Sequence, residues 1–268
     1  MSVAVTMRRV EASHEPMASL SLLAQVPLLQ WLGVALVAFG AAVLGGLAGY
    51  GTGLILPIAL APVIGVANVI PVMAVAMMIN NASRVVAFRH EIEWPHVRRM
   101  LWLGLPTCLF GAWGYTRLEA RWVALLLGAF LLASIPLRRV LRRGDLRLSA
   151  GGEVAAGGMF GVIEGGMTGT GVILISMLMA AGVQGAALIA TDAMISTVMS
   201  LAKTVLFGGA ARLDVALAVT GVLVGLCTAP GAFVARAILH RMPQRVHLGI
   251  METVVVCGGL VFLWRAWK

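Results

Sequence analysis

The sequence predicts an all-α integral membrane protein with about eight transmembrane segments, arranged as two pseudo-symmetric repeats of four segments. Hydrophobic residues make up 60% of its 268 residues, charged residues make up only 12%, and the mean hydropathy is +0.96. A soluble domain of this size cannot bury so much apolar surface. The apolar stretches are continuous and about 20 residues long rather than alternating, which favours helices over a barrel.

A Gly-Thr-Gly motif occurs twice, each time inside an apolar run that is too long for a single crossing. Glycine weakens a helix, so we expect the first segment of each repeat to break at its motif. Paired broken helices are typical of duplicated transporters, where the loosened backbone binds the substrate. The motifs are Gly51-Thr52-Gly53 in the run 30–65 and, 118 residues later, Gly169-Thr170-Gly171 in the run 152–182.

The two halves also match after the motif. Arg84-Val-Val-Ala-Phe88 corresponds to Lys203-Thr-Val-Leu-Phe207 at a spacing of 119 residues. Each stretch ends an apolar run that follows a broken segment. The other apolar runs are 68–88, 100–116, 121–137, 186–207, 214–236 and 247–267. We therefore expect a cytoplasmic tail at 1–28, repeat 1 at 30–137, a basic cytoplasmic linker at 138–150 and repeat 2 at 151–268.

Basic residues indicate the orientation, because Lys and Arg concentrate in cytoplasmic loops. If eight segments cross once each, one side holds five of the 20 Lys and Arg and the side with both termini holds the other 15. We expect this even count, with both termini cytoplasmic, in the inner (plasma) membrane of the cell. If residues 54–66 and 172–182 instead turn back as half-helices, the repeats are inverted and the contrast falls to about twelve against eight. The five are Arg117, Arg121, Arg236, Arg241 and Arg245.

The glycine pattern resembles that of the TauE/SafE family of membrane permeases, also described as sulfite exporters. In that family each half opens with G-x-x-x-G-x-G-G-G-x-x-x-x-P, and the stretch from Gly45 to Pro57 resembles this form, with Thr52 at a usual glycine and three residues instead of four before the proline. The second copy, from Gly161 to Gly171, lacks the proline. The resemblance covers the chain from residue 35 to its end. It implies a duplicated permease whose substrate is a small sulfur-containing anion, such as sulfite or an organosulfonate, and whose transport direction is export.

Two cations at equivalent positions are candidates for binding this anion. Arg84 and Lys203 each lie late in the apolar segment that follows a Gly-Thr-Gly motif. A charged residue inside a span usually faces a cavity and has a function there. Asn81 and Ser200 lie three residues before the cations, on the same helix face. We expect these side chains and the two motifs to form the substrate site. The alternatives are that the cations snorkel to headgroups and that Asn81 and Ser200 only join helices.

Glu164 and Asp192 are the carboxylates well inside predicted spans, and both lie in the second half. Carboxylates at membrane depth can carry protons, so proton coupling through this pair is one hypothesis. Two structural alternatives remain open. Glu164 could form an ion pair with Lys203 or Arg84, and Asp192 could cap the helix after the Gly182–Gly185 turn.

These observations predict a membrane permease rather than an enzyme, with the lipid bilayer and a small anion as its partners. We expect no cofactor, no bound metal and no nucleic acid, because no metal-ligand spacing, nucleotide fingerprint or nucleophile–base pair appears. Two alternatives are a non-transporting membrane accessory protein, which would lack a central polar cavity, and an intramembrane enzyme that uses the two carboxylates. The sequence leaves an oligomeric assembly open.

Overall fold

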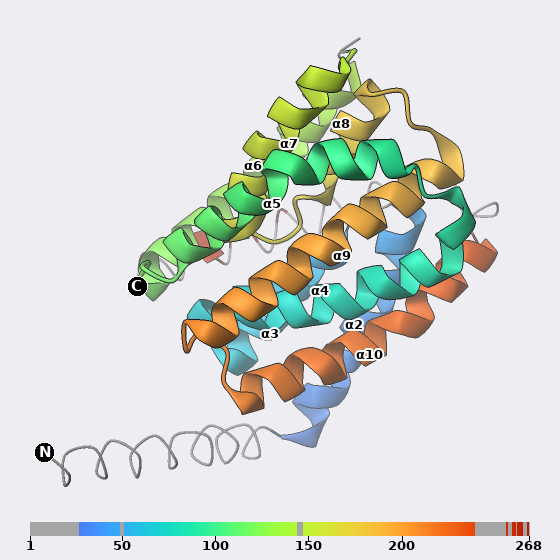
Figure 1. The fold of residues 1–268 in the computed structure, drawn as a ribbon. Helices are drawn as coiled ribbons and strands as arrows, with labels where there is room; N and C mark the ends of the chain where they lie inside the picture. Colours follow the sequence, from blue (N-terminus) through green and yellow to red (C-terminus); the bar gives the residue numbers. More distant parts are fainter. Residues whose placement is uncertain are drawn as a thin grey trace, which may run out of the picture.

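The computed structural model describes residues 27–48, 51–143 and 147–238, together with 256, 259, 260, 262–264 and 267. Almost all of the expected tail at 1–28, part of the expected linker and most of the last apolar run lie outside these residues. Within them the chain forms only helices, joined by short turns (Figure 1). The helices are α2 (Leu28–Ala48), α3 (Thr52–Ile64), α4 (Val66–Phe88), η1 (Arg89–Glu91), α5 (Trp94–Tyr115), α6 (Ala120–Arg143), α7 (Ala150–Gly166), α8 (Gly171–Ala180), α9 (Gly185–Gly209) and α10 (Val215–Ile238).

Four of the described helices are long and apolar enough to cross a membrane. These spans are Leu28–Gly45, Val66–Glu91, Gly185–Gly209 and Val215–Ala235. Shorter apolar helices lie at Thr52–Ile64, Ala120–Ala133 and Gly171–Ala180. The lengths and compositions are those of a multi-pass membrane protein.

Each long apolar run is broken at its Gly-Thr-Gly motif, as the sequence predicts, and the chain reverses there. At the second break the Thr170 side chain, at the start of α8, bonds to Glu164 near the end of α7. At the other end of α8, the Ala180 carbonyl accepts a hydrogen bond from the Leu148 amide, 2.9 Å away and just before α7. The helices α7 and α8 therefore run antiparallel, so the run 152–182 does not cross as one straight segment.

The two central helices, α4 and α9, cross the middle of the molecule in opposite directions (Figure 1). Arg84 near the end of α4 contacts Asp192 near the start of α9. At the opposite end, Tyr115 of α5 bonds to the Ala67 carbonyl of α4 at 2.8 Å and packs edge-on against Phe207 of α9. α4 and α9 therefore run antiparallel, with the substrate-site candidates between them.

Glycines allow α5 and α7 to pack backbone against backbone. A Cβ on Gly157 would clash with the Met100 carbonyl, and a Cβ on Gly161 would clash with the Gly104 carbonyl. Gly165 has the same relation to Cys108. Each step of four residues on α7 thus meets a step of four on α5, so the helices run parallel. Small residues that allow close backbone packing are the usual basis of helix association in membranes, because burial of apolar surface contributes little to the free energy of association in lipid.

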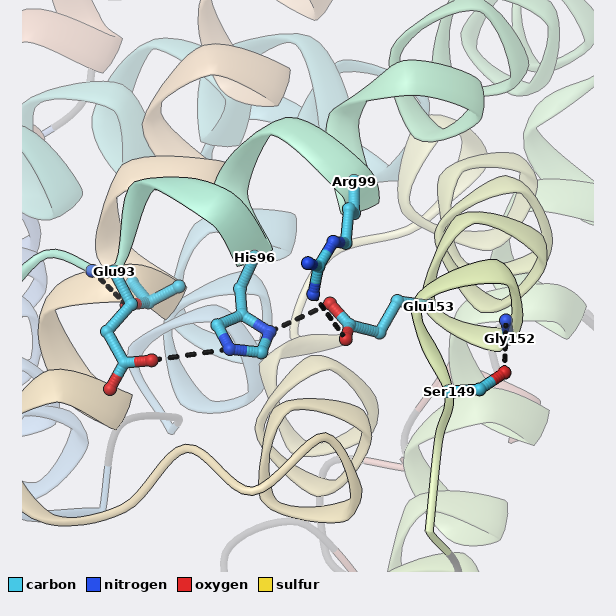
Figure 2. A network of polar contacts seen from close by, with 7 residues as sticks. Glu93, His96, Arg99, Ser149, Gly152 and Glu153 are labelled. Carbon is cyan, nitrogen blue, oxygen red and sulfur yellow. Dashed lines mark hydrogen bonds and ion pairs between the residues drawn. The ribbon is translucent and has the colours of Figure 1, made fainter.

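An ion-pair network joins α5 and α7 at one end of this interface (Figure 2). Glu153 of α7 is buried and accepts from Arg99 at 3.2 Å and contacts the His96 ring at 2.8 Å. The other ring nitrogen of His96 lies 3.3 Å from Glu93. The Glu93 amide donates in turn to the Thr191 hydroxyl of α9 at 3.1 Å. This network fixes the start of α5 against both α7 and α9.

We predict that Gly161→Leu lowers the stability of the protein by about 1–3 kcal/mol, because a larger side chain must force α5 and α7 apart. The matched control is Gly151→Ala in the first turn of α7, where an added Cβ meets nothing within 4 Å. Thermal unfolding of the purified protein in detergent, followed by tryptophan fluorescence, measures both. Equal melting temperatures for Gly161→Leu and the control would contradict the close backbone packing.

Candidate functional site

One cavity between the two halves brings together every residue that the sequence singles out for transport. It holds about 570 Å³ of space that no protein atom occupies, part of which is open to solvent. Its walls come from the two breaks and from α4, α7 and α9. The residues predicted from sequence that line it are Gly51, Thr52, Gly53, Asn81, Arg84, Glu164, Gly169, Thr170, Gly171, Asp192, Ser200 and Lys203.

The two Gly-Thr-Gly breaks touch at the floor of this cavity. A Cβ on Gly53 would lie 2.7 Å from the Gly169 amide nitrogen, and the Thr168 hydroxyl donates to the Gly53 carbonyl at 3.4 Å. Gly51 and Gly169 also have positive φ angles of 132° and 83°, which residues with a Cβ rarely adopt. Glycine is therefore required both for the turns and for the contact between them.

Each motif threonine ties its break back to the preceding helix. The Thr52 hydroxyl donates to the Ala41 carbonyl of α2 at 3.1 Å, and the Thr170 hydroxyl donates to the Glu164 carboxylate of α7. Both threonines are buried. The short helices α3 and α8 thus begin at the cavity, and neither has a side-chain cap on its first turn. Helix N-termini attract negative charge, so both favour an anion in the cavity.

Arg84 and Asp192 form a buried ion pair across the cavity. The Arg84 Nη2 atom lies 2.9 Å from Asp192 Oδ2, and the side chains are 6% and 1% exposed. Arg84 Nη1 donates to Asn81 Oδ1 at 3.2 Å, so Asn81 orients the guanidinium. The remaining atoms of the pair, Arg84 Nε and Asp192 Oδ1, are buried without a hydrogen-bond partner. Buried polar atoms normally have partners, so these two are the atoms on which a ligand can act.

Lys203 and Glu164 form a second buried ion pair, in which the ammonium group and both carboxylate oxygens have hydrogen-bond partners. Lys203 Nζ lies 2.5 Å from Glu164 Oε1 and also donates to the Glu164 main-chain carbonyl at 3.0 Å. The other carboxylate oxygen of Glu164 accepts from Thr170. Because the carbonyl of Glu164 belongs to the last turn of α7, Lys203 also holds the end of that helix next to the break.

The two pairs bear on the structural alternatives that the sequence left open. Glu164 pairs with Lys203, and both cations are buried and line the cavity. Asp192 does not cap its helix, because α9 begins at Gly185 and Gln184 occupies the cap position. Two cations and two carboxylates therefore meet in one cavity, and their formal charges cancel.

Some lining residues were not predicted from the sequence. They include Thr168, which contacts the first break, and Met73 and Met77 of α4. Asn80 and Ser196 also line the cavity. Both residues could have been predicted from the sequence, since each lies about one helical turn from a predicted site residue on the same helix.

The comparison with known protein families agrees with this geometry. A family model described as "Sulfite exporter TauE/SafE" matches residues 34–262. The chain belongs to the TauE/SafE sulfite exporter family. No curated protein and no solved structure gave a match. At the family level, this TauE/SafE protein is a membrane transporter.

We predict that Lys203→Met destabilises this protein by about 3–5 kcal/mol, because it leaves the Glu164 charge buried without a partner. The double variant Lys203→Met/Glu164→Gln removes both charges and should recover much of that loss. Thermal unfolding in detergent of the wild type, both single variants and the double variant gives the coupling energy. Additive effects of the two single substitutions would show that the pair contributes no coupling.

Proposed function

We propose that this protein is a permease that exports a small oxyanion, with sulfite or an organosulfonate as the substrate, and that the cavity between the two breaks is its binding site. The observation that carries the proposal is that two helix N-termini and two buried cations line one cavity. A non-transporting accessory protein would need no such central polar cavity. Family membership supports a sulfur-containing anion as the cargo.

The chemistry of the walls suits an oxyanion. Arg84 can bind two oxygens of one group with its planar guanidinium, while Lys203 acts as a point charge. The first turns of α3 and α8 add backbone N–H groups where the two breaks meet at the cavity. Ser200 contributes a buried hydroxyl to the same wall. An anion with three oxygens could therefore receive hydrogen bonds from several directions at once.

Export suits the energetics of an anion in a cell with a negative interior. Moving one negative charge outward across 100 mV releases about 2.3 kcal/mol. Uptake of the same ion would need coupling to another gradient. We therefore propose outward transport across the plasma membrane as the working direction.

For the membrane topology we propose two inverted repeats, at 30–137 and 151–268. This is the alternative to the even count. The antiparallel course of α4 and α9 supports it, as does the reversal of the chain between α7 and α8. In this arrangement the turn after α4 and the turn after α9 face opposite sides of the membrane.

Cysteine labelling tests this topology. One cysteine at a time replaces an exposed residue, either His90 in η1 or Ala210 just after α9. The background variant has alanine at Cys108, Cys227 and Cys257. We expect a membrane-impermeant maleimide to label one position in intact cells and the other only after permeabilisation. Labelling of both positions from the same side would favour the even count and both termini in the cytoplasm.

Transport is tested by reconstituting the protein in liposomes loaded with radiolabelled sulfite. We predict that the double variant Arg84→Gln/Asp192→Asn lowers the efflux rate by at least about tenfold, because it removes a bidentate anion ligand worth more than about 1.4 kcal/mol. Both members of the pair change together so that no charge stays buried alone. The control is Arg98→Gln, which removes an exposed cation of α5 away from the cavity. Efflux at the wild-type rate in the double variant would contradict the proposed site.

A further inference from the structure

We infer that binding of the anion is accompanied by uptake of one proton at Asp192, so that the charge of the cavity stays balanced while the anion is bound. This inference rests on the proposed function, because it concerns how the same cavity binds its anion. It divides the two carboxylates between two roles. Asp192 exchanges a proton during binding, whereas Glu164 stays ionised and holds Lys203 and the second break in place.

The first step concerns the charge of the empty site. Arg84 pairs with Asp192 and Lys203 pairs with Glu164, so the four charges sum to zero. All four side chains are at least nearly buried, with exposed fractions between 1% and 11%. A monoanion that enters such a neutral, desolvated cavity leaves one negative charge uncompensated. A proton taken up at the same time removes that excess.

The second step identifies the proton acceptor from its hydrogen bonds. Glu164 accepts bonds with both carboxylate oxygens, from Lys203 and from Thr170. Asp192 accepts only through Oδ2, while its Oδ1 is buried with no partner. A proton on Asp192 Oδ1 gives this atom a bond to donate, and an anion oxygen can accept it. Protonating Glu164 would instead weaken two contacts that are already made.

The third step places the anion. Arg84 Nε is a buried donor with no acceptor, in the same ion pair as the bare oxygen of Asp192. An oxyanion beside this pair can accept from Arg84 Nε and from protonated Asp192. Protonation also frees the guanidinium from its countercharge, so that Arg84 can attract the anion fully. The unmet donor and the unmet acceptor are therefore satisfied by one anion and one proton.

The other charged groups near Asp192 leave this assignment intact. The groups that face it are Arg84 from α4, Glu164 from α7 and Lys203 from α9 itself. The turn before α5 approaches through Glu93, whose amide bonds to the neighbouring Thr191 hydroxyl. Since Lys203 and Glu164 neutralise each other, the charge that Asp192 meets when it binds a proton is that of Arg84 and the anion.

The test measures anion binding and proton uptake by the purified full-length protein in weakly buffered detergent solution. The ligand is methanesulfonate, which stays a monoanion across the pH range, because sulfite itself exchanges a proton near neutral pH. We expect the wild type to take up about one proton per anion, and its apparent Kd to rise about tenfold per pH unit above neutrality. In Asp192→Asn we expect no proton uptake and a Kd that is independent of pH.

Two charge-balanced variants separate the carboxylates. Lys203→Met/Glu164→Gln retains the Arg84–Asp192 pair. It should bind the anion more weakly, because it lacks one cation, but still take up about one proton per bound anion, whereas Arg84→Gln/Asp192→Asn should lose anion binding. The proton count of the wild type decides the question even if Asp192→Asn does not fold. Binding of the anion by the wild type without proton uptake would overturn the inference and leave the permease standing. Failure of the wild type to bind or move either methanesulfonate or sulfite would overturn the proposed function as well.

Discussion

The burial of two cations in one cavity is the constraint on which the centre of this molecule depends. An unpaired charge away from water costs several kcal/mol, so each cation needs a partner within reach. Asp192 meets that need for Arg84, and Glu164 meets it for Lys203. Each pair also crosses between elements, the first joining α4 to α9 and the second joining α7 to α9. The charges that suit an anion are thus the same charges that hold the helices around the cavity.

The two halves of the sequence match at several positions but differ in their charges. Arg84 and Lys203 are equivalent at the 119-residue spacing, as are Asn81 and Ser200. The same spacing makes Met73 the equivalent of Asp192, since 192 minus 119 is 73. Both carboxylates therefore belong to the second half, and Arg84 must reach across to find its partner. The two cations therefore have different surroundings. Arg84 has one buried donor, Nε, without a hydrogen-bond partner, whereas Lys203 Nζ has partners.

Sequence patterns predicted which residues line the cavity better than they predicted the path of the chain. The motifs and the equivalent cations could be found because glycine, threonine and charge are conspicuous in an apolar run. The apolar run of the sequence begins at residue 100, but α5 begins at Trp94. The difference arises because the first two turns of α5 carry polar groups such as His96 and Arg99, which lower the local hydropathy. The reversal between α7 and α8 was left open, since a run of apolar residues has the same composition whether the chain continues or turns back. Only contacts such as Leu148 with Ala180 distinguish the two.

The close packing of the surrounding helices explains why the cavity can keep its shape. The backbones of α5 and α7 meet at glycines, and Gly221 and Gly225 of α10 meet α4 in the same way. Interfaces of this kind leave little room for adjustment, because even one added methylene must displace a neighbouring backbone. Thr52 holds the first turn of α3 against α2, and Thr170 holds the start of α8 against α7. The helix α7 in turn belongs to the α5–α7 interface. The donors around the cavity are therefore held in place by the packing, and the binding step that we propose needs only the proton and hydrogen-bond changes at Arg84 and Asp192.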